Sequence, residues 1–562
     1  MPRDPPRPAG DQLRQRARPP GRHAGDPPAA GPARTRRRPS GDRRQARRHR
    51  RDRRPRRGAH RRRIRRRVPR RRRPDDRLPI LRRGTGELRP ARRGPVAGRA
   101  PDHRVNPARR PAPDLQPRHP SEPPDPAPDD GPKAADFGAI VRAHGARGRL
   151  VVQPRMGFSA PARMRAGLLA TRRAAAHTVG TITVDSHTRV GHLRAVEEAL
   201  RAGTDLNGYP VVSHSADTTR QVLHGIRGPG FPVQVRHGSA TPRDIFTAIA
   251  GLGLTATEGG PVSYCLPYGR TRLADAVREW TECSELFAQL RATGTDPHIE
   301  TFGGCMLGQL CPPSQLVAIS LLEAMFFVQH GIRSVSLSYA QQTHPGQDEE
   351  AILALRRLCR EYLRTDNWHV VVYAYMGVYP QTDEGALRLL AKAAELAVTT
   401  GCERLIVKTV AESRRIPTVA ENVQALEYAA AVAANTPGPK PDGAEGPHDD
   451  PDSPTYQEAR ALVEAVLSLD SDMGTALLSA FRHGYLDIPY CLHPDNRGRT
   501  RSHLDADGRL RWADIGSLPL GHLVRGQRPG RVTAPGLLKD LSYVRTTYDA
   551  HDAPPILRSD AR

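Results

Sequence analysis

The chain has 562 residues and a formal net charge of +28, a balance that first suggests a nucleic-acid-binding protein. The charge is unevenly distributed. Residues 1–135 hold 42 of the 87 lysines and arginines and 14 of the 59 acidic residues, so 45 of each kind remain in residues 136–562. The even balance of this larger part excludes a protein that is basic throughout.

Residues 1–135 are predicted to form a disordered Arg/Pro-rich tail, because prolines interrupt the arginine runs and the first aromatic residue is Phe137. Arginine, proline, glycine and alanine all have GC-rich codons, so a misassigned translation start is favoured over an RNA-binding arm. A nucleic-acid-binding protein that acts through this tail stays as an alternative. The tail lacks the apolar stretch of a secretory signal, and a cytoplasmic location is expected.

The longest apolar run, residues 316–328, is too short to span a bilayer and contains Glu323, so no membrane segment is predicted. The seven cysteines show no C-x-x-C spacing and form no Cys/His cluster. Neither a metal site nor a disulfide framework is therefore expected. Free cysteines flanked by apolar residues fit a reducing interior.

From about residue 137, short β-branched runs alternate with longer Ala/Leu-rich segments of helical period, which is the βαβ pattern. Helices are predicted between the strands, for example over residues 162–176 and 384–400. Nine strands are predicted, at residues 150–155, 179–185, 209–214, 233–238, 254–260, 299–304, 335–340, 369–377 and 404–410. An eight-stranded barrel needs one fewer, so one of the nine is wrong or lies outside the ring.

The predicted fold is a (β/α)8 barrel of the α/β class. A doubly wound open sheet would show a Gly-rich phosphate turn after its first strand, and QPRMGF is no such turn. The barrel is expected over residues 136–434, followed by a Pro/Gly/Asp-rich surface loop over 435–458. A C-terminal extension of helix and loop, residues 459–562, is expected to pack on the barrel.

Catalytic groups of such barrels lie where strands end, at the carboxyl face. The predicted strand ends bring Arg155, Arg189, Arg236 and Glu258 to one mouth. Three planar guanidinium groups suit a substrate with two carboxylates, and Glu258 suits an ammonium group. The predicted ligand is an acidic amino acid. The alternative is that each arginine is an ion-paired brace at the end of an element.

Many short motifs occur in the order and at nearly the offsets of a known family. The motifs are QPRMGF, TVDSHTR, LNGYPVV, VQVRHG, TEGGPVSYCLPY, FGG with CPPS, MGVYPQ and VKTVAESRRIPT. Through them, between about Leu150 and Val524, the chain resembles the large epsilon subunit of adenosylcobalamin-dependent glutamate mutase (methylaspartate mutase). The resemblance implies an isomerase that interconverts L-glutamate and L-threo-3-methylaspartate by a radical rearrangement. A related mutase of another amino acid, acting in secondary metabolism, is the alternative.

The resemblance also implies which residues act. Glu258 would be catalytic as well as substrate-binding, and Lys408 and Glu412 would hold the adenosyl ribose. From spacing alone, Lys408 and Glu412 would instead form a strand-end ion pair. The implied substrate-binding residues are Arg155, Arg189, Arg236, His237, Glu258, Tyr264 and Tyr268. The implied cofactor-binding residues are Gly157, Asn207, Pro267, Tyr379, Lys408, Glu412 and Ile416.

The implied partner is a small sigma-type cobalamin-binding subunit, which would supply the cobalt ligand from an Asp-x-His-x-x-Gly loop. A homodimer within a heterotetramer is expected. Residues 183–193 nearly match that loop, but the stiff Val190 stands in place of its glycine. His187 is therefore expected to be a packing residue or to support the site from behind, and Arg189 to be the functional residue. Tyr379 stands where the family more often has phenylalanine.

Overall fold

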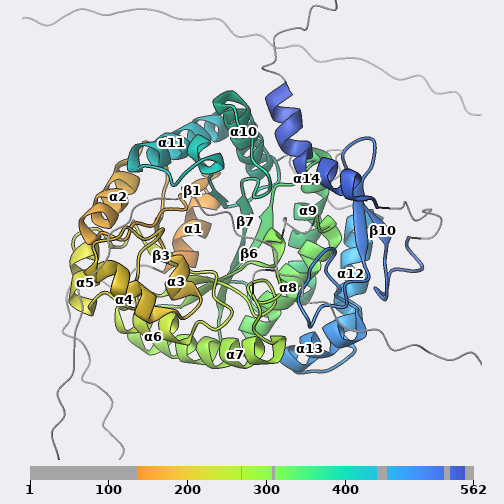
Figure 1. The fold of residues 1–562 in the computed structure, drawn as a ribbon, viewed down its shortest axis with the longest axis horizontal. Coiled ribbons are helices and arrows are strands. Elements are labelled where there is room, and N and C mark those ends of the chain that lie inside the picture. The colour runs from red at the N-terminus through yellow and green to blue at the C-terminus, as the bar shows by residue number, and fades with distance from the viewer. Residues whose placement is uncertain (1–135, 268, 307–309, 440–451, 525–531, 551–562) are drawn as a thin grey trace, which may run out of the picture. The chain divides into compact units, whose positions relative to one another are not determined.

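The computed structural model describes residues 136–267, 269–306, 310–439, 452–524 and 532–550. The predicted tail and Tyr268 lie outside these ranges. Eight parallel strands form one sheet in the order β1-β8-β7-β6-β5-β4-β3-β2, with helices around it (Figure 1). The strands are β1 (Val151–Gln153), β2 (Gly180–Thr183), β3 (Val233–Arg236), β4 (Ala256–Gly259), β5 (His298–Thr301), β6 (Ser334–Ala340), β7 (Trp368–Tyr373) and β8 (Arg404–Ile406).

The helices follow the strands in the order predicted for a barrel. Those of the ring and its loops are α2 (Pro161–Arg173), α3 (Ser186–Arg189), α4 (Leu193–Arg201), α5 (Ala216–Leu223), α6 (Arg243–Gly251), α7 (Leu273–Gln289), η1 (Leu290–Thr293), η2 (Gly303–Cys305), α8 (Pro313–Gln329), α9 (Pro345–Tyr362), α10 (Asp383–Thr399), η4 (Val410–Ser413) and α11 (Val419–Asn435). Outside the ring lie α12 (Pro454–Leu467), α13 (Met473–His483), the hairpin of β9 (Arg501–Leu504) and β10 (Leu510–Asp514), and α14 (Ala534–Asp549) (Figure 1).

The sheet nearly closes on itself between β1 and β2. Just before β2, His177 accepts a hydrogen bond of 2.8 Å from the N–H of Val152. Just after β1, Met156 accepts one of 2.9 Å from the N–H of Thr183. The prediction of a (β/α)8 barrel is confirmed.

The strand predicted at residues 209–214 is wrong. Tyr209 makes only an isolated bridge to Val184, and the chain then turns over residues 211–213. The ring has no place for this segment, because β2 and β3 pair directly, with Gly180 opposite Val233. Pro210 also lacks the N–H that a ladder position must donate.

The ends of the described chain differ from expectation in three places. Helix α1 (Phe137–Gly145), which the sequence pattern did not predict, precedes the first strand, and the side chain of Asp136 caps it by accepting the N–H of Ala139. The predicted loop at 435–458 ends earlier, because α12 begins at Pro454. Residues 440–451 of that loop lie outside the described ranges. The β9–β10 hairpin stands where helix and loop were expected.

Helix α8 is the long apolar run of the sequence, and it is buried on nearly every side. It packs against β5 and β6 of the barrel on one side and against α9, α12 and α13 on the other. A helix that is hydrophobic all round belongs in a core. Each of its buried leucines and phenylalanines contributes roughly 1.5–3 kcal/mol by leaving water. Helix α8 thus joins the barrel to the C-terminal extension.

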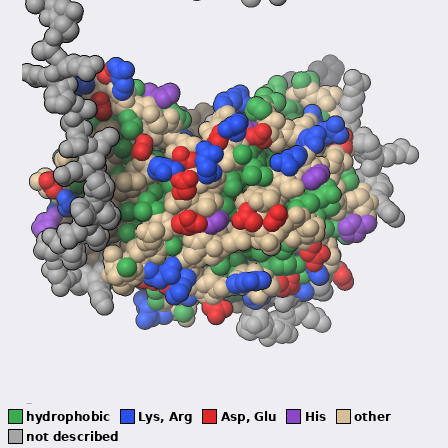
Figure 2. Space-filling view, turned by 90° about the horizontal axis from the view of Figure 1, so that it is seen from below, with side chains coloured by type: hydrophobic (Ala, Val, Ile, Leu, Met, Phe, Trp, Pro, Cys, Tyr) green, Lys and Arg blue, Asp and Glu red, His purple; other side chains and the backbone are tan. Residues whose placement is uncertain are grey.

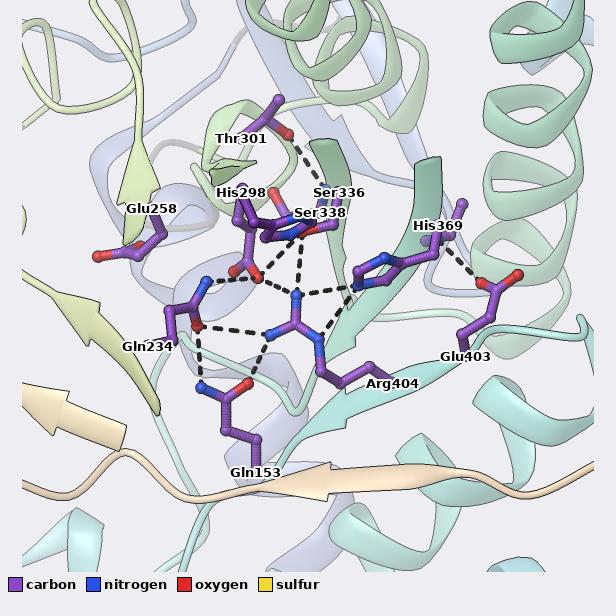
Figure 3. A network of polar contacts seen from close by, with 12 residues as sticks. Gln153, Gln234, Glu258, His298, Thr301, Ser336, Ser338, His369, Glu403 and Arg404 are labelled. Atoms are coloured by element: carbon purple, nitrogen blue, oxygen red, sulfur yellow. Dashed lines mark hydrogen bonds and ion pairs between the residues drawn. The ribbon is translucent and has the colours of Figure 1, made fainter. Parts of the chain in front are cut away.

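The interior of the barrel is polar (Figure 3). Arg404 of β8 lies at its centre and forms a fully buried ion pair with Glu300 of β5. Ser336 accepts from Nη2 of Arg404 at 3.0 Å, and Nε of Arg404 lies 3.3 Å from His369. Gln153 also accepts from Arg404. The guanidinium group therefore holds four strands together through directed bonds.

The outer surface shows acidic and basic side chains interspersed on one face (Figure 2). In the described part of the chain no helix is both long and apolar enough to cross a membrane.

Replacing Arg404 by methionine should leave Glu300 as an unpaired buried charge. We expect the free energy of unfolding to fall by about 3–5 kcal/mol, measured by urea denaturation. The matched control is Arg460→Met, which breaks an exposed i,i+4 pair with Glu464 and should cost about 1 kcal/mol or less. Equal losses in the two variants would contradict a central role for the Arg404 pair.

Candidate active site

A cavity of about 640 Å³ opens at the carboxyl ends of the strands. Its walls come from the loops that follow β1, β2, β3, β4, β5, β7 and β8. Ten of the residues singled out from the sequence line it: Arg155, Gly157, Arg189, Asn207, Arg236, His237, Glu258, Tyr264, Glu412 and Ile416. The barrel thus gathers residues that are far apart in the sequence.

Two tight backbone contacts set the positions of the first two arginine loops. After β1, Gly157 lies against β2 so closely that a Cβ there would be 2.2 Å from the carbonyl oxygen of Thr183. After β2, Asp185 caps α3 by accepting the N–H groups of His187 and Thr188, each at 2.9 Å. This capped turn ends at Arg189.

The three arginines reach the cavity with different partners. Arg155 donates to Glu412 at 3.1 Å and stays about one-third exposed. Arg236, the last residue of β3, is buried and donates to the hydroxyl of Tyr373 at 3.1 Å. The buried Nε atoms of Arg189 and Arg236 have no hydrogen-bond partner among the described residues. The arginines are therefore only partly used as braces, and donors remain for an anion.

Arg189 lies over the backbone of Gly238. Gly238 has a φ of +70°, and a Cβ there would be 3.0 Å from Nε of Arg189. Glycine takes this left-handed conformation without strain and also leaves room for the guanidinium group. The VQVRHG motif thus supplies both Arg236 and the glycine, Gly238, against which the Arg189 side chain packs.

His237 is neutral in this setting. Burial, aided by the charges of Arg189 and Arg236, lowers the pKa of His237 to about 3. Its Nδ1 accepts the N–H of Ser239 at 3.0 Å, which assigns the proton to Nε2. This Nε2 is buried and has no hydrogen-bond partner in the described ranges. His237 therefore offers one further donor without adding a charge.

Glu258 keeps one carboxylate oxygen open. Oε1 accepts the N–H of His237 at 3.0 Å, whereas Oε2 lies 3.6 Å from Nη2 of Arg236 and accepts no hydrogen bond of standard geometry from described residues. Burial raises the pKa of Glu258, and the charge of Arg236 opposes this rise. An open acceptor beside guanidinium groups can bind the ammonium group of an amino acid.

Lys408 and Glu412 lie near Arg155, and of these two only Glu412 lines the cavity. The ammonium of Lys408 sits 4.2 Å from the ring centre of Tyr379, and burial lowers the pKa of Lys408 to about 8. Glu412 binds Arg155 and the N–H of Thr409, so the strand-end ion pair between Lys408 and Glu412 is not formed. Across the described residues no hydrogen bond or ion pair of the Lys408 ammonium is found.

Three described residues of the predicted site, Lys408, Tyr379 and Pro267, do not line this cavity. Pro267 is half-buried in the same loop as Tyr264, and Tyr268 lies outside the described residues. His187 was expected either to pack or to support the site from behind; it is exposed on α3, which excludes packing and leaves the supporting role a prediction. Asn207 lines the cavity, but its Oδ1 is occupied by the N–H of Ser186 at 2.9 Å.

Sequence reasoning missed Tyr373, Glu300 and Phe302. Tyr373 donates to Glu300 and accepts from Arg236, so it links the polar interior to the cavity. The signal was the period-two spacing of His369, Val371 and Tyr373 in the strand predicted at 369–377, which places them on one face. Phe302 forms part of the cavity wall and packs against Tyr264, with ring centres 4.8 Å apart.

A parallel barrel with an arginine-rich cavity at its carboxyl end is the arrangement of an enzyme that binds a small anionic substrate. The family model of the methylaspartate mutase E chain (MutE) matches residues 132–539. The chain belongs to this family, whose members are isomerases of the mutase class. The resemblance found in the motifs is confirmed.

Individual relatives agree with the family match. Proteins named glutamate mutase epsilon subunit from Yersinia enterocolitica, Escherichia coli O157:H7 and Haloarcula marismortui are 30%, 28% and 31% identical over 351, 358 and 346 residues. The alignments cover 60% of this chain in each case, and 72%, 72% and 70% of the relatives.

Replacing Tyr373 by phenylalanine should remove the link between Glu300 and Arg236. We expect the free energy of unfolding to fall by about 1–3 kcal/mol in a urea titration, because two buried polar groups lose a partner. Tyr375→Phe is the control, since the hydroxyl of Tyr375 bonds to no described residue. A loss no larger than that of the control would show that the link contributes nothing.

Lys408 should be distinguishable by its titration. The chain has five lysines, Lys133, Lys392, Lys408, Lys440 and Lys539, so reductive ¹³C-methylation gives a simple NMR spectrum. One resonance should titrate with a midpoint near 8 and disappear in Lys408→Arg. Because the pKa of Lys408 in the folded protein lies below the usual lysine value of 10.5, this lysine also makes the fold more stable as pH rises from about 8 to 10.5. Five resonances that all titrate near 10.5 would refute the assignment.

Proposed function

We propose that this chain is the substrate-binding subunit of an adenosylcobalamin-dependent mutase that interconverts L-glutamate and L-threo-3-methylaspartate. The observation that carries the proposal is the convergence of Arg155, Arg189 and Arg236 on one cavity beside Glu258. Two carboxylates need more guanidinium donors than one anion does, and an ammonium needs an acceptor. The cavity supplies both, as the buried donors without partners and the open Oε2 of Glu258 indicate.

The residues present fit the cofactor. Lys408 holds a buried ammonium without a hydrogen-bond partner among the described residues, and the nearby Glu412 lines the cavity. These two would hold the ribose of the adenosyl group. Gly157, Asn207, Pro267, Tyr379 and Ile416 would contact the rest of the cofactor. When bound, adenosylcobalamin supplies the radical chemistry that the side chains of this cavity cannot perform.

The part of the protein in the reaction is to bind, orient and exclude water. Arg155, Arg189 and Arg236 grip the two carboxylates, so both parts of the substrate stay in register while its carbon skeleton rearranges. The Nε2–H of His237 adds a neutral donor to the same end of the cavity. Glu258 binds the ammonium and is the residue that can accept a proton from it, because burial raises its pKa toward that task.

A partner subunit would cover the mouth. Val190, Val378 and Ile416 follow three different strands and expose 57%, 38% and 53% of their surface. Exposed apolar residues around a cavity mark a docking surface. We take the partner to be a small cobalamin-binding subunit that carries the cobalt ligand, in a heterotetramer built on a dimer of this chain. The relatives named epsilon subunit support a multi-subunit enzyme.

The test is an assay of the purified chain with a small cobalamin-binding subunit and adenosylcobalamin, with glutamate conversion followed by ¹H NMR. Arg155→Met, Arg189→Met and Arg236→Met should each lower kcat/KM by about tenfold to more than a hundredfold, because each removes a charge-assisted bond to a carboxylate. Arg278→Met, an exposed arginine on α7, is the control and should leave it unchanged.

The class of substrate is tested by competition. Glutarate-type dicarboxylates should inhibit, whereas glutamine, which lacks the second carboxylate, should bind roughly tenfold to a hundredfold more weakly. Conversion of another amino acid in preference to glutamate would replace the proposed substrate. Full activity in all three arginine variants would overturn the proposal.

A further inference from the structure

Helix α8 carries one carboxylate that its packing does not explain. Glu323 lies in the middle of the apolar run, and its side chain is fully buried. A carboxylate taken out of water costs stability unless hydrogen bonds compensate, and leucine or methionine would fill this place at lower cost. The contacts of the Glu323 carboxylate therefore indicate what it does.

The carboxylate binds the backbone that follows β4. Oε1 of Glu323 accepts the N–H groups of Val262 at 3.2 Å and Ser263 at 2.9 Å. A Cβ on Gly260 would be 2.0 Å from the same oxygen, so the glycine lets the chain lie directly on the carboxylate. The backbone N–H of Phe302, after β5, lowers the pKa of the same carboxyl, but Oε2 accepts no hydrogen bond of standard geometry from described residues. One side chain thus holds the first residues of the loop after β4 and lies beside those of the loop after β5.

These loops carry two walls of the cavity. Tyr264 directly follows the bound amides, is nearly fully buried, and packs against Phe302 and the ring of His237. Its hydroxyl also acts on the Glu258 carboxyl. A shift of the bound backbone would therefore move Tyr264 relative to Glu258.

We propose that Glu323 is a positioning residue of the site, whose carboxylate fixes residues 260–264 and so sets Tyr264 against Glu258. It touches neither the cavity nor a ligand, and it acts through the backbone. The inference rests on the proposed function for the identity of the substrate. The anchoring itself depends only on the contacts of Glu323.

The anchoring is tested by hydrogen–deuterium exchange on the full chain without partner or cofactor. At pH 8.5, above the pKa of about 7 to which burial raises Glu323, the peptide that covers residues 261–266 should exchange about tenfold faster in Glu323→Gln, because a neutral acceptor replaces a charged one. Glu458→Gln is the control. Glu458 is a half-buried glutamate on α12 that accepts hydrogen bonds from Ser314 and Trp512, and its replacement should leave this peptide unchanged.

A second variant approaches the same contact from the loop. Gly260→Ala must push the backbone and the carboxylate apart, whereas Gly251→Ala, at the end of α6, meets no atom within 4 Å. Gly260→Ala should speed exchange in residues 261–266, and Gly251→Ala should not. This pair decides the question if Glu323→Gln does not fold.

The positioning role is tested in the assembled enzyme. Glu323→Gln should raise KM for glutamate about tenfold and change kcat less than threefold, because a displaced wall weakens binding before and during reaction alike. In a Tyr264→Phe background the same substitution should cost less than threefold, since it acts through Tyr264. Glu458→Gln should leave both constants unchanged.

Faster exchange together with the KM effect and its loss in the Tyr264→Phe background would support the proposal. Unchanged exchange in both Glu323→Gln and Gly260→Ala would overturn it, as would faster exchange with unaltered KM. Absence of mutase activity in the wild-type enzyme would refute the proposed function instead. The exchange result would still decide whether Glu323 anchors the loop.

Discussion

The buried ion pair of Arg404 and Glu300 is the interaction on which the site depends. Glu300 also accepts a hydrogen bond from the hydroxyl group of Tyr373, and that hydroxyl in turn accepts a hydrogen bond from Arg236 at the cavity. The position of a guanidinium group at the mouth is thereby set from the middle of the barrel. The hydrogen bonds of this polar interior fix the conformations of its side chains. An apolar interior would make no such bond to Arg236, whose side chain could then adopt several rotamers. Rigid strands carry the charges, and the loops supply the walls.

The cavity limits its positive charge and leaves several of its hydrogen-bond donors unpaired. His237 is held neutral by burial and by two arginines, and burial lowers the pKa of Lys408. A neutral His237 adds no further charge to the repulsion among Arg155, Arg189 and Arg236. Donors that stay unpaired in a buried wall cost stability, and such strain is typical of places that a ligand will satisfy. The large apolar core around α8 offsets that cost.

The sequence predicted those parts that local pattern determines. Strand ends marked by Arg155, Arg236 and Glu258 follow from β-branched runs that stop at polar residues. The strand at 209–214 was mistaken because its pattern is strand-like, although Pro210 and the direct pairing of β2 with β3 both exclude it. Strands of a parallel barrel are buried on both faces, so the period-two spacing around Tyr373 shows which residues share its face but not whether that face points into the barrel. Contacts across the ring, such as Arg404 with Gln153, are set by closure of the barrel and not by neighbours in the chain.

The TEGGPVSY segment shows how closely packing and chemistry are joined. Glu258 faces the cavity, Gly259 lies against Trp280, and Gly260 lies on Glu323. Each glycine is required by a different neighbour, so the pair cannot be read as a flexible hinge. Tyr264 then returns to the cavity beside Glu258. Within seven residues the chain leaves the site, touches the core on two sides and comes back, so the packing of the core contributes to the shape of a binding wall.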